Sequence, residues 1–170
     1  MTNYAIFAKN PQRVPELKAI AEMRGFTYDP EFPQFMITIG GDGTFLLAEH
    51  RYPGIPKLLV RDSLICYKCH NEPIDEMLRI IAEGRYLIKE ILKLRAAFNA
   101  SGPLAANDII IRNTDPRHAL RFRLTIDATS EDDILIGDGV VVATPFGSTG
   151  YFRSITRQSF FEGIGLGFNN

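Results

Sequence analysis

The sequence lacks the features that mark membrane, secreted and nucleic-acid-binding proteins. It has no apolar run near the roughly 20 residues that a membrane-spanning helix needs, so we expect no membrane partner. The chain does not open with a basic region followed by an apolar stretch, which predicts no secretory signal and a cytoplasmic location. The formal net charge of -1 at pH 7 argues against a nucleic-acid partner, because nucleic-acid-binding proteins are normally basic.

The chain is also poor in cysteine, with only Cys66 and Cys69. In a cytoplasmic protein we expect both to be reduced thiols. Together with His70 they match the C-x-x-C-H haem-attachment pattern, but that modification requires export, and a zinc site would require two more ligands at suitable spacing. We therefore interpret the motif as a chance or structural feature, and we predict no metal held by protein ligands.

What the sequence does contain is enough apolar material for a folded core. Its 170 residues suffice for one ordinary domain or two small ones, and 45% of them are hydrophobic. In the first half, short apolar runs typical of buried strands alternate with segments of helical spacing. The expected strands are residues 4–8, 34–39 and 56–60, and the expected helices are residues 14–24, 44–51 and 73–84. This alternation predicts a small parallel, Rossmann-like sheet with helices packed on it.

The second half changes to a period of two, which is typical of antiparallel strands with one buried face. The expected strands are residues 86–98, 105–112, 119–127 and 134–144, with a strand or turn at residues 163–170. We place a domain boundary near residue 85, so that residues 1–85 form an α/β lobe and residues 86–170 form an antiparallel, sandwich-like β lobe. About five strands do not close a sandwich, so we expect either a C-terminal truncation or a surface covered by another subunit.

The sharpest local feature is the run Gly40-Gly41-Asp42-Gly43-Thr44, between a predicted strand and a predicted helix. Glycines at such a turn let backbone N–H groups approach a phosphate, and a helix N-terminus favours its negative charge. Thr44 could cap the helix and donate to a phosphate. The alternative is a plain tight turn in which Asp42 is the cap. In a phosphate-binding loop, the carboxylate suits proton acceptance from a hydroxyl nucleophile, or the orientation of Mg²⁺.

A second feature is the run from Gly137 to Tyr151. Asp138, flanked by glycines, precedes an apolar strand, and a turn dense in Gly, Ser and Thr follows that strand. The turn exposes hydroxyl and amide groups, and Tyr151 adds an aromatic face for a base or a nicotinamide. Taken alone, the run is also compatible with an ordinary cluster of β-turn residues.

Together the motifs resemble those of the NAD kinase family. The Gly-Gly-Asp-Gly-Thr loop is shared by a kinase superfamily that also includes diacylglycerol kinases, sphingosine kinases and phosphofructokinases. The later run is similar to the NAD kinase version, Asp-Gly, a strand and then Thr-Pro-x-Gly-Ser/Thr-Thr-Ala/Gly-Tyr. Between them, Asn107-Asp108 resembles that family's Asn-Glu or Asn-Asp pair. The resemblance spans residues 35–152 and implies an α/β lobe, a β-sandwich lobe, and phosphoryl transfer from ATP or polyphosphate to the adenosine 2′-hydroxyl of NAD.

The resemblance also implies roles for individual residues. Asp42 would be the general base toward the 2′-hydroxyl, and Asp138 would bind the second ribose or the nicotinamide end. The positions implied to hold phosphates of ATP or of the NAD pyrophosphate are Gly40, Gly41, Gly43 and Thr44. The positions implied to bind the adenosine portion of NAD are Asn107, Asp108, Thr149, Gly150 and Tyr151. Mg²⁺ would be held mostly by ATP phosphates, and the protein would be a homodimer or homotetramer.

Three departures from the family pattern motivate alternatives. Phe146 replaces a usual small residue near the expected adenine, residues 61–64 lack the usual Gly-rich Ile-Asn-x-Gly pattern, and residues 152–154 replace a Gly-Gly. We expect Arg61 to pair with Asp62 rather than to contact a phosphate. The alternatives are a non-catalytic nucleotide-binding relative, and a lipid or sugar kinase that shares only the first motif.

Overall fold

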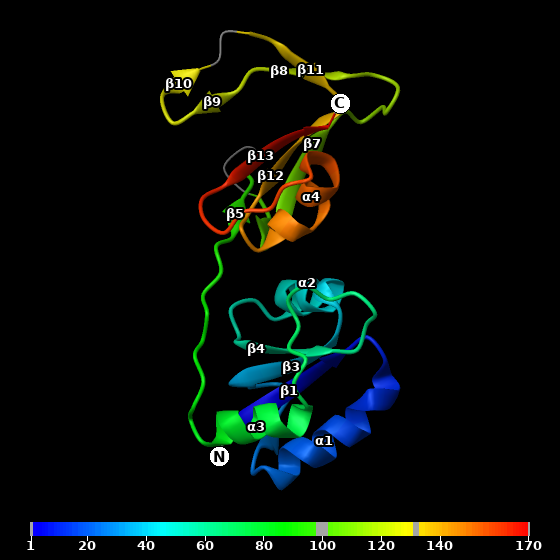
Figure 1. Cartoon of the computed structure of the whole chain (residues 1–170), viewed down its shortest axis with the longest axis vertical. Helices are drawn as coiled ribbons and strands as arrows, with labels where there is room; N and C mark the ends of the chain where they lie inside the picture. Colours follow the sequence, from blue (N-terminus) through cyan, green and yellow to red (C-terminus); the bar gives the residue numbers. More distant parts are fainter. Residues whose placement is uncertain (1, 98–101, 131–132, 170) are drawn as a thin grey trace. The chain divides into compact units, whose positions relative to one another are not determined.

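The computed structural model describes residues 2–97, 102–130 and 133–169. The chain divides into two compact units, Met1–Lys89 and Glu90–Asn170, which are described separately below (Figure 1). Within the described residues, no helix combines the length and the apolar character that crossing a membrane requires.

The first unit is built on a four-stranded parallel sheet with the strand order β2-β1-β3-β4. Its strands are β1 (Asn3–Ala8), β2 (Thr27–Tyr28), β3 (Phe35–Gly40) and β4 (Lys57–Arg61). Strand β3 lies between β1 and β4, so that Ile37 is opposite both Ile6 and Leu58. The predicted parallel sheet is confirmed, and the three predicted strands differ from the observed ones by at most one residue at either end.

Helices cover both faces of this sheet. They are α1 (Val14–Met23), which follows the 3-10 turn η1 (Pro11–Arg13), then α2 (Asp42–Arg51) and α3 (Ile74–Ala82). The sheet, α1 and α3 enclose a core that includes Tyr4, Leu17, Ile37 and Leu78, each 0% exposed. Figure 1 shows α2 on the opposite side of the sheet from α1 and α3. Because both layers cover β3, all six of its residues are buried, and the strand shows no polar alternation.

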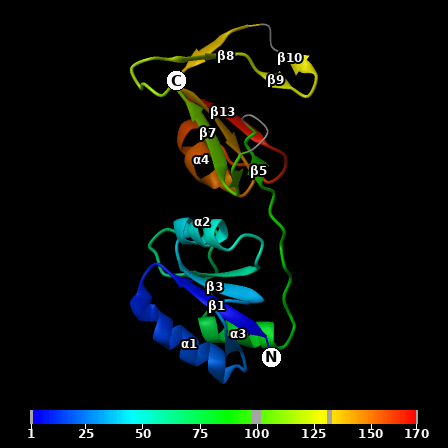
Figure 2. The same cartoon turned by 180° about the vertical axis from the view of Figure 1, so that it is seen from behind.

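The second unit is centred on an antiparallel sheet of three strands in the order β13-β12-β7 (Figure 2). These strands are β7 (Asp108–Arg112), β12 (Gly139–Ala143) and β13 (Gly165–Asn169). The turn η2 (Gly147–Thr149) and the short helix α4 (Tyr151–Thr156) follow β12. Phe152 of α4 packs with Val141 and Ala143 in a small core. The predicted antiparallel character of this half is confirmed.

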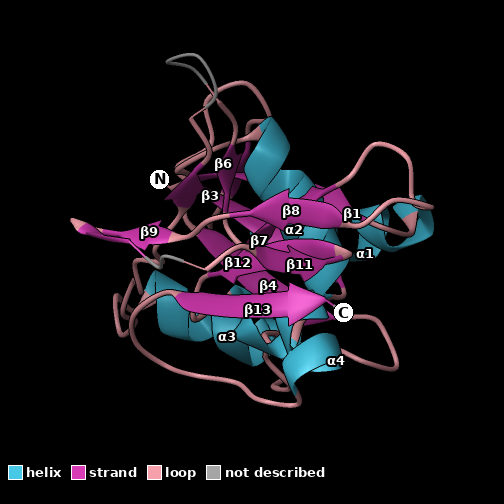
Figure 3. Cartoon of the chain, turned by 90° about the horizontal axis from the view of Figure 1, so that it is seen from above, coloured by secondary structure: helices cyan, strands magenta, loops and turns pink. Residues whose placement is uncertain are grey.

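The remaining strands of this unit form short antiparallel pairs (Figure 3). The pairs are β5 (Leu94–Arg95) with β6 (Leu104–Ala105), β8 (Leu120–Phe122) with β11 (Leu135–Gly137), and β9 (Thr125–Ile126) with β10 (Thr129–Ser130). Each pair is only two or three residues long and so contributes few main-chain hydrogen bonds.

Two expectations for the second unit are wrong in detail, and one helix was missed. Residues 119–127 form two strands rather than one, because β8 ends at Phe122 and β9 begins at Thr125. Of residues 86–98, the described part contains strand only at Leu94–Arg95, and Phe98 lies outside the described residues. Helix α4 was not expected at all. Leu87 is 99% exposed, so its alternating segment has no surface to pack on, and alternation alone does not make a strand.

Candidate functional site

The loop Gly40–Thr44 joins the end of β3 to the start of α2, with Gly41 as the N-cap residue. A side chain at Gly40 is excluded, because its φ is +154° and a Cβ there would lie 2.2 Å from Oγ1 of Thr44. Gly43 is different: it is exposed, its φ is ordinary and nothing lies within 4 Å of a Cβ built there. Packing within the protein therefore explains why position 40 is a glycine but does not explain the glycine at position 43. A ligand that approaches the backbone closely would explain the second one.

Thr44 shapes this loop from the inside. Its side chain is buried, and Oγ1 accepts a hydrogen bond from the N–H of Gly41 at 3.3 Å. This bond satisfies one of the amide groups that a helix N-terminus leaves without a partner. The expectation that Thr44 caps the helix is thus met by its hydroxyl, which points toward the loop backbone.

Asp42 does not cap the helix; its carboxylate is bound by a different segment. Oδ2 accepts a hydrogen bond from the N–H of Tyr67 at 3.1 Å, and Oδ1 accepts one from the N–H of Lys68 at 3.0 Å. The Lys68 side chain is half-buried, and burial lowers the pKa of its ammonium group, although the Asp42 carboxylate acts in the opposite direction. The interpretation of Asp42 as a simple helix cap is therefore wrong.

The two cysteines are joined in a disulfide, with a Cα–Cα distance of 5.6 Å, so the expectation of reduced thiols is wrong. That expectation rested on the cellular compartment, whereas the C-x-x-C spacing is short enough to bring the sulfurs together. Among the described residues, Asp42, Cys66 and Cys69 form the one group of three potential metal ligands. Metal binding requires thiolates, so the disulfide form offers no such site.

The segment that carries the disulfide is anchored by Arg61 and Asp62, which do not pair with each other as expected. Asp62 forms an ion pair with Arg13 at 3.0 Å, and its N–H donates to the carbonyl of Gly40 at 2.9 Å. The Arg61 guanidinium donates to the carbonyl groups of Ser63 and Leu64, at 3.1 and 2.7 Å. Arg61 thus organises the turn that leads from β4 to the disulfide.

In the second unit, Thr144 joins two of the motifs found in the sequence. Its buried hydroxyl donates to the carbonyl of Ala106 at 2.7 Å and accepts the N–H of Gly147 at 2.9 Å. The N–H of Thr144 donates to the carbonyl of Asn107 at 3.0 Å. These bonds hold the Asn107 motif against the glycine-rich turn.

Close packing around Asn107 accounts for two glycines of that turn. A Cβ at Gly147 would lie 1.9 Å from the carbonyl oxygen of Asn107, and one at Gly150 would lie 2.9 Å from its Nδ2. The Asn107 amide also donates to Asp108 Oδ2 at 3.3 Å. Burial raises the pKa of the Asp108 carboxyl, because the charged form is less well solvated there.

A cavity of about 570 Å³ is lined by Asp138 and Tyr151, which stand near the two ends of the second motif. Its polar lining also includes Arg112, Asn113 and His118. Tyr151 is 41% exposed, so part of its ring is open to a ligand. The cavity combines an aromatic face, a carboxylate and the Arg112 guanidinium, which suits a nucleoside with attached phosphate.

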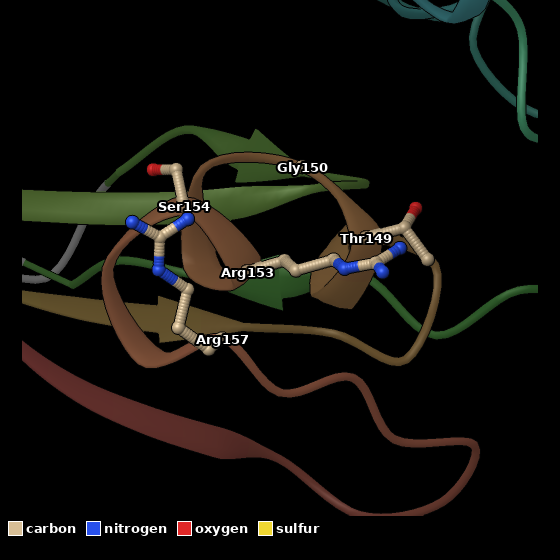
Figure 4. A pocket seen from close by; sticks show the side chains of 5 residues that line it. All are labelled: Thr149, Gly150, Arg153, Ser154 and Arg157. Carbon is tan, nitrogen blue, oxygen red and sulfur yellow. The ribbon is translucent and has the colours of Figure 1, made fainter.

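Thr149 and Gly150 line a second pocket, of about 350 Å³, with Arg153, Ser154 and Arg157. Figure 4 shows the Arg153 guanidinium extending toward Thr149 and the Arg157 guanidinium beside Ser154. The two like charges are four residues apart along the chain, and Arg157 has a left-handed φ of 62°. The left-handed conformation costs stability in a residue other than glycine. Two guanidinium groups with adjacent hydroxyls suit the oxygens of phosphate groups.

The structure therefore places the sequence-predicted residues in both units: the loop Gly40–Thr44 lies in the first, whereas those of the second are divided between the two pockets and the Asn107–Asp108 segment. Sequence reasoning missed the buried hydroxyls of Thr144 and Ser148, although both lie inside the recognised motif. It also missed Arg153 and Arg157. A signal for them is present in the sequence, because residues 139–161 contain these two arginines and no acidic residue. Nothing in the sequence pattern distinguishes Arg112 or His118.

Comparisons with known proteins agree with these motifs. No protein-family model matches the chain. NAD kinase from Pyrococcus abyssi is 36% identical over 140 residues, which cover 79% of this chain and 48% of the relative. NAD kinase from Sulfurisphaera tokodaii is 32% identical over 167 residues, which cover 94% of this chain and 64% of the relative. The resemblance to NAD kinases is thus confirmed, and the chain spans about half to two thirds of the length of these curated relatives.

Solved structures show the same fold. An NAD kinase from Archaeoglobus fulgidus in complex with ATP matches with a TM-score of 0.75 at 19% identity, covering 98% of this chain and 72% of that one. Yeast NADH kinase complexed with NADH matches with a TM-score of 0.66 at 16% identity, covering 99% of this chain and 66% of that one. The order of an α/β part followed by an antiparallel part is therefore the NAD kinase fold.

Proposed function

We propose that this relative of the NAD kinases transfers a phosphoryl group from ATP, or from polyphosphate, to the adenosine 2′-hydroxyl of NAD and so forms NADP. The observation that carries the proposal is the loop Gly40–Thr44, in which a carboxylate stands at the start of α2 beside a glycine that no packing requires. Curated relatives named NAD kinase, over most of the chain, support the choice of substrate.

In the first unit, Asp42 would act as the general base. It would accept the proton of the 2′-hydroxyl as that oxygen attacks the γ-phosphorus. Backbone N–H groups of Gly40, Gly41 and Gly43 would hold phosphate oxygens, aided by the N-terminus of the ten-residue helix α2. Thr44 would contribute by fixing the loop, since its hydroxyl is bonded to Gly41.

In the second unit, the residues around Thr144 would bind the dinucleotide. The group that would hold the adenosine portion comprises Asn107, Asp108, Thr149, Gly150 and Tyr151. Asp138, on the 570 Å³ cavity, would bind the second ribose or the nicotinamide end. The pocket with Arg153 and Arg157 would receive phosphate groups, because its lining includes no acidic residue.

Mg²⁺ would be held mainly by the phosphates of ATP. Mg²⁺ prefers oxygen ligands in an octahedral arrangement. Asp42, Cys66 and Cys69 are the one candidate ligand group among the described residues, and they supply a single carboxylate, so a protein cage for Mg²⁺ does not fit. When bound with ATP, the ion would offset the charge that develops on the transferred phosphoryl group.

The apolar surface of the second unit supports a homodimer or homotetramer. Ile111 and Phe168, which share one face of the central sheet through Val140 between them, are 52% and 42% exposed, and Ile136 is 58% exposed. Exposed apolar side chains on neighbouring strands are typical of surfaces that another chain covers. We propose that a second copy covers them, and that the protein works in the cytoplasm.

Neither alternative is favoured by a specific observation. A lipid or sugar kinase would share only the first motif, whereas the match to the NAD kinase of Sulfurisphaera tokodaii covers 94% of the chain and so includes both. A non-catalytic relative would bind NAD without turnover, and the assay below separates it from the proposed enzyme.

The test is an NADP-formation assay with purified protein, NAD, ATP and Mg²⁺, run beside the Asp42→Asn variant. We expect NADP from the wild type and a loss of about 100-fold or more in the variant, which is the usual contribution of a general base. Asp62→Asn, which alters a nearby carboxylate paired with Arg13, is the control and should keep most of the activity. NAD binding without turnover by the wild type would establish the non-catalytic alternative instead.

A further inference from the structure

The Cys66–Cys69 disulfide lies directly against the loop that carries Asp42. Sγ of Cys66 is 3.0 Å from Oδ1 of Asp42, and Sγ of Cys69 is 3.8 Å from the carbonyl oxygen of Gly40. The bridge encloses only Tyr67 and Lys68, whose backbone N–H groups are the ones that bind the carboxylate. A single covalent bond therefore fixes the peptide that holds Asp42.

In this state main-chain N–H groups of the protein already bind both oxygens of the carboxylate. A carboxylate has about four acceptor positions, two on each oxygen. The N–H of Tyr67 takes one position on Oδ2 and the N–H of Lys68 takes one on Oδ1, while the Cys66 sulfur, which carries no hydrogen in the disulfide, lies 3.0 Å from Oδ1 and covers that side of it. A carboxylate enclosed in this way is poorly placed to receive a proton from a substrate hydroxyl.

Reduction would alter this arrangement. Bonded sulfurs are about 2 Å apart, whereas two thiol sulfurs must separate to a non-bonded distance of roughly 3.5 Å or more. The enclosed peptide must then rearrange, and the two N–H bonds to Asp42 loosen. Cys66 and Cys69 are both partly exposed, so a small dithiol can reach the bridge.

We propose that Cys66 and Cys69 are a reversible thiol–disulfide modification site, which restrains Asp42 when oxidised and releases it when reduced. The chemical partner is a dithiol reductant. Its first thiolate attacks one Sγ and expels the other cysteine as a thiolate, and its second thiolate then displaces the remaining protein sulfur. Two electrons and two protons pass to the protein, and the reductant leaves as its own disulfide. The effect on turnover rests on the proposed role of Asp42 as the base.

Hydrogen exchange at the Tyr67 and Lys68 amides tests the restraint without measuring turnover. We expect both amides to exchange about tenfold faster or more after reduction with dithiothreitol, because their bonds to Asp42 open more often. The amide of Ile37, in the buried strand β3, is the internal control and should not change. The Cys66→Ser/Cys69→Ser variant should show the fast exchange with and without oxidant. Equal exchange in the oxidised and reduced wild type would overturn the proposal.

NADP formation by the same samples tests the consequence for Asp42. The oxidised wild type should turn over about tenfold more slowly than the reduced wild type, a difference of about 1.4 kcal/mol in the barrier. The serine variant should form NADP at the rate of the reduced wild type, and oxidant should not change that rate. Faster exchange without faster turnover would refute control of catalysis. If no sample forms NADP, the proposed kinase function fails, and the exchange data alone decide whether the disulfide restrains the loop.

Discussion

The two units of this chain contrast in how their strands are buried. In the first unit, β3 is covered by helices on both faces and every one of its residues is buried. In the second unit, β9 and β10 are exposed along their whole length, and the central sheet keeps Ile110 and Ile111 about half exposed. The difference teaches that the first unit contains a core of its own, whereas the second is organised around a hydrogen-bonded turn and a small apolar cluster.

The largest expected effect comes from removing a core side chain in each unit. Leu78→Ala should cost about 3 kcal/mol, because Leu78 is fully buried and the truncation leaves a cavity. Val141→Ala removes about two methylene equivalents from the second unit and should cost about 1.6 kcal/mol. Urea unfolding monitored by hydrogen exchange reports the two units separately. A larger loss of unfolding free energy from Val141→Ala than from Leu78→Ala would contradict the conclusion that the first unit has the more extensive core.

Two buried threonines offer a matched comparison of slightly smaller size. Thr144→Val leaves the N–H of Gly147 and the carbonyl of Ala106 without their partner, and should cost about 2 kcal/mol. Thr38→Val, in the first unit, removes only a bond to the carbonyl of Leu58 and should cost about 1 kcal/mol. Calorimetry with NAD should show weaker binding for Thr144→Val alone. Equal affinities in the two variants would contradict the role given to the turn.

The two glycines of the first loop should respond in opposite directions. Gly40→Ala should destabilise the first unit by about 1–3 kcal/mol, because the new Cβ meets Thr44 Oγ1. Gly43→Ala should leave stability unchanged or raise it by up to about 1 kcal/mol, since the position is helical and open. Gly43→Ala should nevertheless reduce NADP formation if a phosphate approaches that backbone. A fully active Gly43→Ala protein would contradict the proposal that a phosphate approaches the loop backbone at this position.

The smallest effects concern pH, and they have opposite signs in the two units. Burial raises the pKa of Asp108 in the folded state, so its favourable contribution is complete at low pH and is lost as pH rises through that pKa. Hydrogen bonds from Arg24 lower the pKa of Asp75, so its contribution is present at neutral pH and is lost as pH falls through that pKa. At pH 7, Asp108→Asn should raise the unfolding free energy and Asp75→Asn should lower it. Repeating the measurement near pH 3 should shrink both differences.

The sequence allowed the first unit to be predicted almost completely, for a physical reason. Strands buried on both faces are continuous apolar runs bounded by glycine or proline, and the helices between them show their buried faces by spacing. The strands of the second unit are short and depend on contacts made far along the chain. Residues 119–127 alternate well yet form two strands, and α4 has only six residues.

The residues of the candidate site that lie in short sequence motifs could be predicted, whereas the contacts between distant segments could not. Asp42 and Tyr151 follow from local patterns, and Asn107 follows from the resemblance to the NAD kinase family. The binding of Asp42 by the amides of Tyr67 and Lys68 does not, because these residues are 25 and 26 positions away. The disulfide was missed because the compartment argument was given more weight than the C-x-x-C spacing.

The most direct test of the account separates binding from transfer. NAD affinity by calorimetry and NADP formation should be measured together for Asp42→Asn in the first unit and Tyr151→Ala in the second. We predict that Asp42→Asn binds NAD as the wild type does but loses about 100-fold or more in turnover, whereas Tyr151→Ala binds NAD more weakly. An Asp42→Asn protein that still forms NADP at the wild-type rate would contradict the assignment of the base, and with it the central claim.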